Sequence, residues 1–460
     1  MKVLYVLSLI YLKSLLAIAA NDDEIKSLPG LPEPTKFKQY SGYLNASKGR
    51  HHFYWFVESE KDAANAPVVL WLTGGPGCSS LFAMFTENGP FRVNSDGKTL
   101  QKHDFAWNSV ANILWMESPA GTGFSYEDNV AEPHNNDETT ALNNYLALES
   151  FFLKYPHLKK NQFYITGESY AGVYIPMLAK QIYEHNSTIN LKGLAIGNGY
   201  IHEDKFDNFG QSRYDFALGH GLLTTDTYEK LTENCCECKA GVIEHQCDFS
   251  QPANHSKCAS VRQSSVSTPN PYNIYDNCAP DLSYQQLFNK YYKQAYDRIG
   301  FKVDFNNNDN KANCYHYGHS LYLNTESVRK AIHVRENSRR WEGCGGPYER
   351  VHTATQEQNT LDLINKYKIG KFIIYNGDFD TVCDFIGDQR FADKLGFTQT
   401  EKYRRWTVDG QPDGVIGGFV QHYEKGFSFV LVRGAGHMVP YDQPEAGLQL
   451  LKSLIGNTKL

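Results

Sequence analysis

Short, continuously apolar runs recur along this sequence, and most of them stop at a glycine- or proline-rich turn. They cover residues 52–57, 68–72, 111–116, 162–166, 191–196, 371–375 and 427–432. Such runs are typical of strands buried on both faces of a parallel sheet. Residues 139–153 carry apolar side chains at helical spacing between two of these runs. The alternation predicts an α/β fold with a mostly parallel central sheet and helices on both faces.

The alternation breaks off near Tyr200. Residues 201–320 hold seven of the ten cysteines and no clear strand–helix–strand unit, and residues 302–313 are rich in Asn and Asp. We therefore predict a core in two parts, 21–200 and 321–460, separated by a disulfide-stapled cap insertion at 201–320. Within this insertion, residues 302–313 are expected to form an exposed loop.

The first twenty residues have the pattern of a secretory signal peptide: a lysine, an apolar run and small residues at the end. An uncleaved membrane anchor is the alternative, but Lys13 interrupts a run that is already short for a span. Ten cysteines fit the oxidising compartment that a signal peptide implies. Acceptor sequences for N-linked glycans begin at Asn45, Asn186 and Asn254.

The charge balance argues against a nucleic-acid partner. The chain has 45 Lys and Arg against 51 Asp and Glu, a net charge of −6, and no long basic run. After the leader, no segment is apolar for long enough to span a membrane. We expect no metal and no cofactor, and no membrane attachment after removal of the leader.

Three polar residues follow predicted strands in an order that indicates nucleophilic catalysis. Ser169 lies in the segment 167–172 (GESYAG) between a strand and a helix, where a sharp turn would expose its hydroxyl. Asp380 follows a later strand, and His437 follows the last one. The order Ser, Asp, His is that of α/β-hydrolases. Asp378 and Asp384 remain alternatives for the acid.

Four segments together resemble the serine carboxypeptidase family: 71–80 (WLTGGPGCSS), 167–172 (GESYAG), 376–380 (NGDFD) and 436–440 (GHMVP). The resemblance spans nearly the whole mature chain, and the inserted region is most similar to the lysosomal members. It implies an α/β-hydrolase fold and an exopeptidase that releases C-terminal residues through an acyl-enzyme. It also implies Ser169, His437 and Asp380 as the triad, with Asp380 preferred because the family places the acid at the second Asp of the motif.

The same resemblance assigns substrate-binding roles. The oxyanion hole would be formed by the backbone N–H groups of Gly75 and Tyr170, and Met438 would line the pocket for the departing residue. The group that binds the substrate carboxylate would consist of Trp71, Thr73, Gly74, Glu87 and Glu168.

Two Glu residues can bind the substrate carboxylate only if at least one of them is protonated. If both lie beside the substrate carboxylate, like charges force a proton to be shared, and a protonated Glu becomes a donor. Binding would then weaken as the pH rises. Thr73 departs from the family, which usually has Asn there, so the contact with the carboxylate is expected to differ.

The family's cysteine pattern implies four disulfides: Cys78–Cys344, Cys235–Cys258, Cys236–Cys247 and Cys278–Cys314. Cys238 is then an extra cysteine, and Cys383 is expected to be a buried free thiol near the site. In the lysosomal members the loop near 302–313 is excised during maturation, and we expect the same here.

The resemblance also indicates surroundings and partners. It implies peptide substrates with a free C-terminus, a homodimer, a lysosomal, vacuolar or secreted location, and a protective role toward partner glycosidases. An acyltransferase on the same scaffold is an alternative, because plant relatives use the same triad to transfer acyl groups. The presence of Ser169, Asp380 and His437 argues against a protective role alone. Whether water or an alcohol takes the acyl group distinguishes hydrolysis from acyl transfer.

Overall fold

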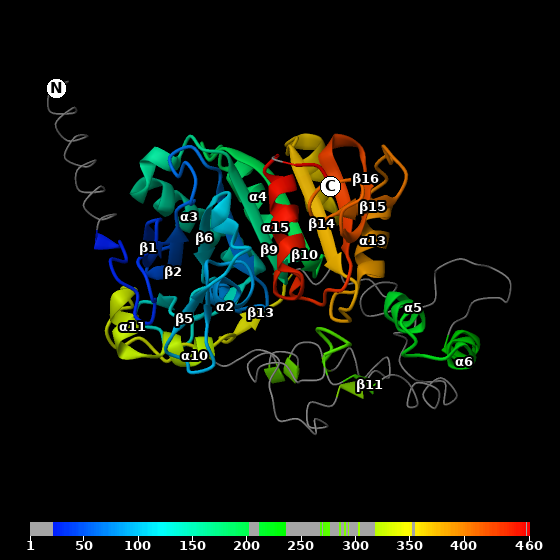
Figure 1. Cartoon of the computed structure of the whole chain (residues 1–460), viewed down its shortest axis with the longest axis horizontal. Helices are drawn as coiled ribbons and strands as arrows, with labels where there is room; N and C mark the ends of the chain where they lie inside the picture. Colours follow the sequence, from blue (N-terminus) through cyan, green and yellow to red (C-terminus); the bar gives the residue numbers. More distant parts are fainter. Residues whose placement is uncertain are drawn as a thin grey trace. The chain divides into compact units, whose positions relative to one another are not determined.

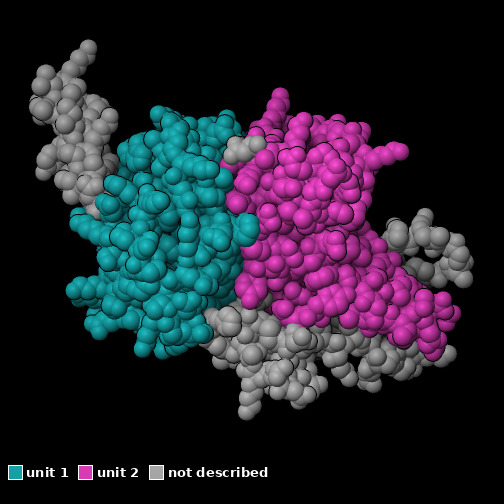
Figure 2. Space-filling model, in the orientation of Figure 1, with its two compact units in different colours: residues 1–166, 177–193, 317–351 teal, residues 167–176, 194–316, 352–460 magenta. Residues whose placement is uncertain are grey.

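A computed structural model describes residues 22–201, 211–235, 267–268, 270–276, 285–286, 289–290, 293, 302–303, 318–351, 355–456 and 458–460. The predicted leader, the third glycan acceptor at Asn254, most of the insertion and most of its cysteines lie outside these residues. The chain divides into two compact units (Figure 2). Unit 1 comprises residues 1–166, 177–193 and 317–351, and unit 2 comprises residues 167–176, 194–316 and 352–460.

The strands and helices of unit 1 come mostly from the first part of the chain (Figure 1). Its strands are β1 (Gln39–Asn45), β2 (Arg50–Val57), β3 (Val68–Thr73), β4 (Phe91–Val93), β5 (Leu100–Lys102), β6 (Asn112–Met116), β7 (Tyr126–Glu127), β8 (Asn135–Asn136) and β13 (Tyr348–Glu349). Its helices are α2 (Ser80–Thr86), α3 (Asp137–Lys154), α10 (Gly318–Leu323) and α11 (Glu326–Ala331). Strand β9 (Phe163–Ser169), helix α4 (Ala171–Glu184) and strand β10 (Leu191–Gly199) contribute residues to both units.

Unit 2 contains the rest of the described elements. Its strands are β11 (Ser267–Thr268), β12 (Lys302–Val303), β14 (Lys371–Gly377), β15 (Arg404–Thr407), β16 (Ile416–His422) and β17 (Phe427–Val432). Its helices are α5 (Gln211–Gly219), α6 (Thr225–Cys235), α12 (Glu357–Leu361), α13 (Phe385–Lys394), α14 (Val439–Asp442) and α15 (Pro444–Leu454).

The strand order within each unit matches the predicted class. In unit 1 the order is β1-β2-β6-β3-β9, and in unit 2 it is β10-β14-β17-β16-β15. The pairs β3–β6 and β14–β17 are parallel, whereas β1–β2, β2–β6, β16–β17 and β15–β16 are antiparallel. The antiparallel pairs lie at the β1 and β15 ends of these orders, and the parallel pairs lie inside them. The fold is α/β with a parallel central part, as predicted.

Aromatic contacts show how unit 1 covers its strands. Trp55 and Phe56 are neighbours on β2, so their side chains point to opposite faces of the sheet. The ring of Trp55 lies 5.6 Å from that of Phe85 in α2, and the ring of Phe56 lies 5.2 Å from that of Phe151 in α3. Helices α2 and α3 therefore pack on opposite faces of these strands.

The described elements include no helix that is both long enough and apolar enough to cross a membrane.

Candidate active site

Ser169 is the last residue of β9, and α4 begins two residues later at Ala171. Its φ is +60°, in the left-handed region that residues other than glycine seldom occupy. A sharp, strained turn between a strand and a helix is what a nucleophile elbow requires. Ser169 therefore lies in the sharp turn between a strand and a helix that the sequence predicts.

The elbow is tight because two backbone segments meet there. Tyr200 donates its backbone N–H to the carbonyl oxygen of Ser169 at 2.8 Å. A Cβ atom on Gly172 would lie 2.8 Å from backbone atoms of Tyr200. The motif has Ala171 where G-x-S-x-G has its second glycine, but the close approach is at Gly172, one residue later.

His437 and Asp380 form a buried pair. Nδ1 of His437 lies 2.7 Å from Oδ2 of Asp380, and the two side chains are 1% and 0% exposed. Nε2 of His437 is buried and has no hydrogen-bond partner among the described residues. A carboxylate at Nδ1 holds an imidazole in one tautomer, which is the arrangement that a catalytic histidine requires.

The two alternative acids have other partners. Asp378 accepts hydrogen bonds from the backbone N–H groups of Gly434 and Ala435, at 2.7 and 3.3 Å. Asp384 is the N-cap of α13 and accepts from the backbone N–H of Gly387 at 2.9 Å. Asp380 is thus the carboxylate that contacts His437.

A segment of the predicted insertion packs against the turn that carries His437. The backbone carbonyl oxygen of Tyr272 accepts a hydrogen bond from the backbone N–H of His437 at 2.7 Å. The centroid of the Tyr272 ring lies 5.1 Å from that of the imidazole. Asp442 accepts from the backbone N–H of Gly436 at 2.7 Å, and burial raises the pKa of Asp442 to about 7. The sequence singled out neither Tyr272 nor Asp442, because nothing in their local patterns indicates proximity to His437.

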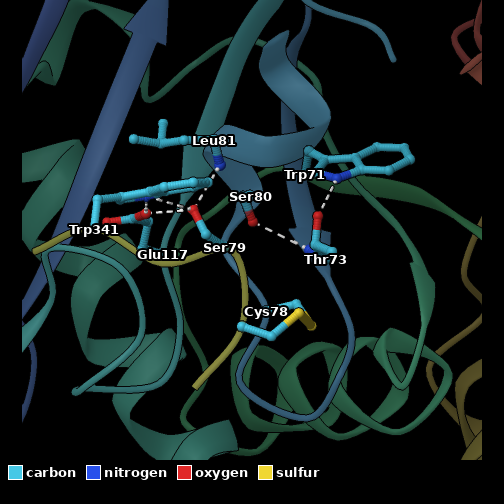
Figure 3. Close-up of a disulfide and its surroundings, with 9 residues drawn as sticks. Trp71, Thr73, Cys78, Ser79, Ser80, Leu81, Glu117 and Trp341 are labelled. Atoms are coloured by element: carbon cyan, nitrogen blue, oxygen red, sulfur yellow. Dashed lines mark hydrogen bonds between the residues drawn. A yellow bond between two sulfur atoms is a disulfide. The ribbon is translucent and has the colours of Figure 1, made fainter. Parts of the chain in front are cut away.

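Of the residues assigned to carboxylate binding, Trp71, Thr73 and Gly74 follow one another at the end of β3 in unit 1. The indole Nε1 of Trp71 donates to Oγ1 of Thr73 at 2.9 Å, and the backbone N–H of Thr73 donates to Oγ of Ser80 at 3.1 Å (Figure 3). Thr73 Oγ1 therefore accepts from Trp71, and its hydroxyl proton points elsewhere.

The remaining substrate-binding candidates are divided between the units. Gly75 belongs to unit 1 and has a φ of +110°, and a Cβ there would lie 2.7 Å from the backbone N of Cys78. Glu87 also belongs to unit 1 and is fully buried, which excludes a solvated loop carboxylate. Glu168, Tyr170 and Met438 belong to unit 2 and are all buried.

One implied disulfide lies within the described residues. Cys78 is bonded to Cys344, 266 residues away in the chain, and Cys383 is a buried free thiol, as the resemblance implied. Burial raises the pKa of the Cys383 thiol well above its usual value. The other three implied pairs each involve a cysteine outside the described residues. The first two glycan acceptors, Asn45 and Asn186, are exposed.

A buried carboxylate beside this disulfide was not predicted. Glu117 accepts hydrogen bonds from the hydroxyl of Ser79 and from the indole N–H of Trp341 at 2.8 Å (Figure 3). It also accepts from the backbone N–H of Phe124 at 2.6 Å. Burial nevertheless raises the pKa of Glu117 to about 7. Because Ser79 is the N-cap of α2, Glu117 anchors the turn between β3 and α2.

Comparison with known proteins decides the family. The serine carboxypeptidase family model matches residues 29–457. The chain belongs to the serine carboxypeptidase family. It is similar to lysosomal protective protein of Mus musculus, with 38% identity over 95% of this chain and 94% of the relative. It is also similar to serine carboxypeptidase ctsa-4.1 of Caenorhabditis elegans, with 35% identity over 95% of this chain and 93% of the relative.

A solved structure supports the fold of this carboxypeptidase. The prohormone-processing carboxypeptidase Kex1 of Saccharomyces cerevisiae aligns with a TM-score of 0.70 over 95% of this chain and 96% of the other, at 23% identity. The α/β-hydrolase fold predicted from the order of Ser169, Asp380 and His437 is therefore confirmed. The protein is a serine carboxypeptidase, a hydrolase.

Proposed function

We propose that this serine carboxypeptidase releases C-terminal residues through a triad of Ser169, His437 and Asp380. The observation that carries the proposal is the 2.7 Å contact between His437 Nδ1 and Asp380 Oδ2, in the same unit as the strained turn at Ser169. The contact leaves Nε2 of the imidazole as the atom that exchanges protons.

In the proposed reaction, Oγ of Ser169 attacks the carbonyl carbon of the last peptide bond while His437 Nε2 takes the hydroxyl proton. The C–N bond then breaks, and the imidazolium returns the proton to the leaving amino group. The resulting acyl-enzyme is hydrolysed by water through the same steps. Asp380 remains ionised and stabilises the imidazolium.

We assign the oxyanion hole to the backbone N–H groups of Gly75 and Tyr170. Support comes from their positions in the chain: Gly75 lies in a glycine turn after β3, and Tyr170 lies between the proposed nucleophile and the start of α4. Backbone donors at such places commonly stabilise the oxyanion of acyl transfer.

We assign recognition of the substrate carboxylate to Trp71, Thr73, Gly74, Glu87 and Glu168. Burial of both Glu side chains supports a protonated donor, because burial disfavours the charged form of a carboxyl group. In this assignment the hydroxyl of Thr73 donates its proton to the substrate, while its oxygen accepts from Trp71. Activity would then favour acidic pH.

Met438 would line the pocket for the departing residue, since it follows His437 and is buried. The similarity to a lysosomal protein supports a lysosomal, vacuolar or secreted location. A homodimer and a protective association with lysosomal glycosidases are proposed on the same resemblance, and acyl transfer remains the second catalytic candidate.

The test compares a peptide with a free C-terminal carboxylate and its C-terminally amidated twin, at about pH 5 and pH 7, with the natural enzyme and Ser169→Ala. We expect release of the last residue from the free acid, faster at the lower pH, and none with Ser169→Ala. Equal cleavage of the amidated peptide would contradict the carboxylate site. Activity in Ser169→Ala would overturn the triad, and transfer to an added alcohol in preference to water would favour the acyltransferase.

A further inference from the structure

The end of strand β10 contacts both the proposed nucleophile and the proposed acid. Asn198 is fully buried there and has a φ of +42°. Its Nδ2 donates to Oδ2 of Asp380 at 2.9 Å, and its Oδ1 accepts the backbone N–H of Gly377 at 3.1 Å. The side chain therefore bridges the acid and the end of the strand that leads to it.

The residues after Asn198 extend these contacts. The backbone N–H of Gly199 donates to Oδ2 of Asp388 at 3.2 Å, and that of Tyr200 donates to the carbonyl oxygen of Ser169 at 2.8 Å. A single stretch of three residues therefore links the elbow at Ser169 to Asp380.

The carboxylate of Asp380 accepts hydrogen bonds from three described donors besides His437. Its Oδ2 accepts from His437 Nδ1, from Asn198 Nδ2 and from the backbone N–H of Cys383 at 3.1 Å, while Oδ1 accepts from the backbone N–H of Val382 at 2.8 Å. Among these partners, Asn198 provides the one side-chain donor apart from the imidazole. Both backbone donors belong to the turn that carries Asp380 itself, so Asn198 and His437 supply the contacts that tie the carboxylate to other parts of unit 2.

We propose that Asn198 is a positioning residue of the triad, which holds the carboxylate of Asp380 in line with His437 and in register with the elbow at Ser169. The inference rests on the proposed function of these three residues. Asn198 does not contact the reacting atoms, so its effect reaches the substrate through Asp380 and His437.

A purely conformational role for Asn198 makes a different prediction. Asn and Asp are both tolerated at positive φ, and glycine adopts it freely. If the backbone shape alone mattered, Asn198→Asp and Asn198→Gly would both retain activity. If the amide donor matters, both variants lose it, but Asn198→Asp regains a donor whenever its carboxyl group is protonated.

The test measures kcat and KM for the free-acid peptide from about pH 4.5 to 7.5 in both variants. We expect kcat to fall about ten- to a hundredfold in Asn198→Gly at every pH, with little change in KM, as for loss of a hydrogen bond to a charged group. For Asn198→Asp, the kcat of the variant divided by that of the natural enzyme should fall as the pH rises, because two ionised carboxylates would then repel each other.

Other ionisable groups lie near Asp380, and they are common to all variants compared. They are His437, Cys383, Asp384, Asp388, Asp442 and Arg213. The pH-dependent ratio therefore reports the group introduced at position 198.

Two controls keep the result decisive. Asn161→Asp makes the same change at a buried Asn of unit 1, whose Nδ2 donates to the carbonyl oxygens of Ala64 and Ala66, and it should give a ratio independent of pH. Ser169→Ala tests the triad itself, so activity in that variant overturns the proposed function rather than this inference alone. With Ser169→Ala inactive, a kcat within twofold of the natural enzyme in Asn198→Gly, or a pH-independent ratio in folded Asn198→Asp, would overturn the positioning role.

Discussion

Nη2 of Arg213 donates to the carbonyl oxygen of Thr381 at 2.7 Å, one residue beyond Asp380. The same nitrogen lies 3.3 Å from the carbonyl oxygen of Val382, and the arginine is fully buried in α5. A helix of the predicted insertion thus holds the turn that carries the proposed acid.

Replacing this arginine should weaken both the fold and the turn. Arg213→Met would leave two buried carbonyl oxygens without their donor, so we expect the free energy of unfolding to fall by about 3 kcal/mol. The measurement is urea unfolding, with kcat as a second readout. Arg405→Met on the exposed edge strand is the matched control and should change stability by less than about 0.5 kcal/mol. Equal stability of the two variants would contradict the assigned role.

The close approach at the elbow predicts the effect of a single methyl group. In Gly172→Ala the added Cβ would lie 2.8 Å from the backbone of Tyr200, and backbone atoms there can yield only by moving the elbow. We expect a loss of about 1–3 kcal/mol in stability and a lower kcat. Thermal unfolding and steady-state kinetics check this. Gly219→Ala, where no atom lies within 4 Å of the added methyl, should be nearly neutral.

The buried carboxyl of Glu117 should make stability depend on pH. Its pKa is raised, mainly by burial, from an ordinary 4.5 to about 7. Between these values the folded state binds more protons than the unfolded state, so this contribution is complete below about pH 4.5 and is lost as the pH rises through 7. The loss amounts to about 3 kcal/mol across this range.

Glu117→Gln should remove this part of the pH dependence. We expect the stability difference between the natural enzyme and the variant to shrink by about that amount from pH 4.5 to 7.5 in urea unfolding. Glu60→Gln, at an exposed position, should leave the slope unchanged. A constant difference across the range would show that the carboxyl does not titrate there.

The assignment of the acid can be tested by paired amides. Asp380→Asn should lower kcat about 10⁴-fold, because an amide beside Nδ1 favours the wrong imidazole tautomer. Asp378→Asn should cost far less, since its amide oxygen can still accept from Gly434 and Ala435. The measurement is kcat/KM on the free-acid peptide. A larger loss in Asp378→Asn would overturn the choice of Asp380.

The main strands could be predicted from sequence because they are continuously apolar. Strand β16 is not among the predicted strands, because Gly417 and Gly418 interrupt its apolar pattern. In the structure a Cβ on Gly417 would lie 2.4 Å from the ring of Trp406, and one on Gly418 would lie 1.9 Å from the carbonyl oxygen of Leu431. The glycines provide space for neighbouring chain, and only the three-dimensional pairing reveals this.

The same limit applies to the site. Ser169, Asp380 and His437 follow predicted strands, so their local patterns and their order along the chain were informative. Glu117 also follows an apolar strand, but its partner Trp341 is 224 residues away. Asn198 lies between two glycines at the end of β10. This pattern indicates an unusual backbone conformation, but it does not indicate that Asn198 contacts Asp380.

The bond between Cys78 and Cys344 has a consequence for any processed form of this enzyme. It encloses the whole stretch from residue 79 to residue 343, which includes the loop 302–313. A cut anywhere in that stretch, or removal of a piece from it, therefore leaves the amino-terminal and carboxyl-terminal fragments covalently joined. A matured enzyme would migrate as one species on a non-reducing gel and separate into two only after this disulfide is reduced.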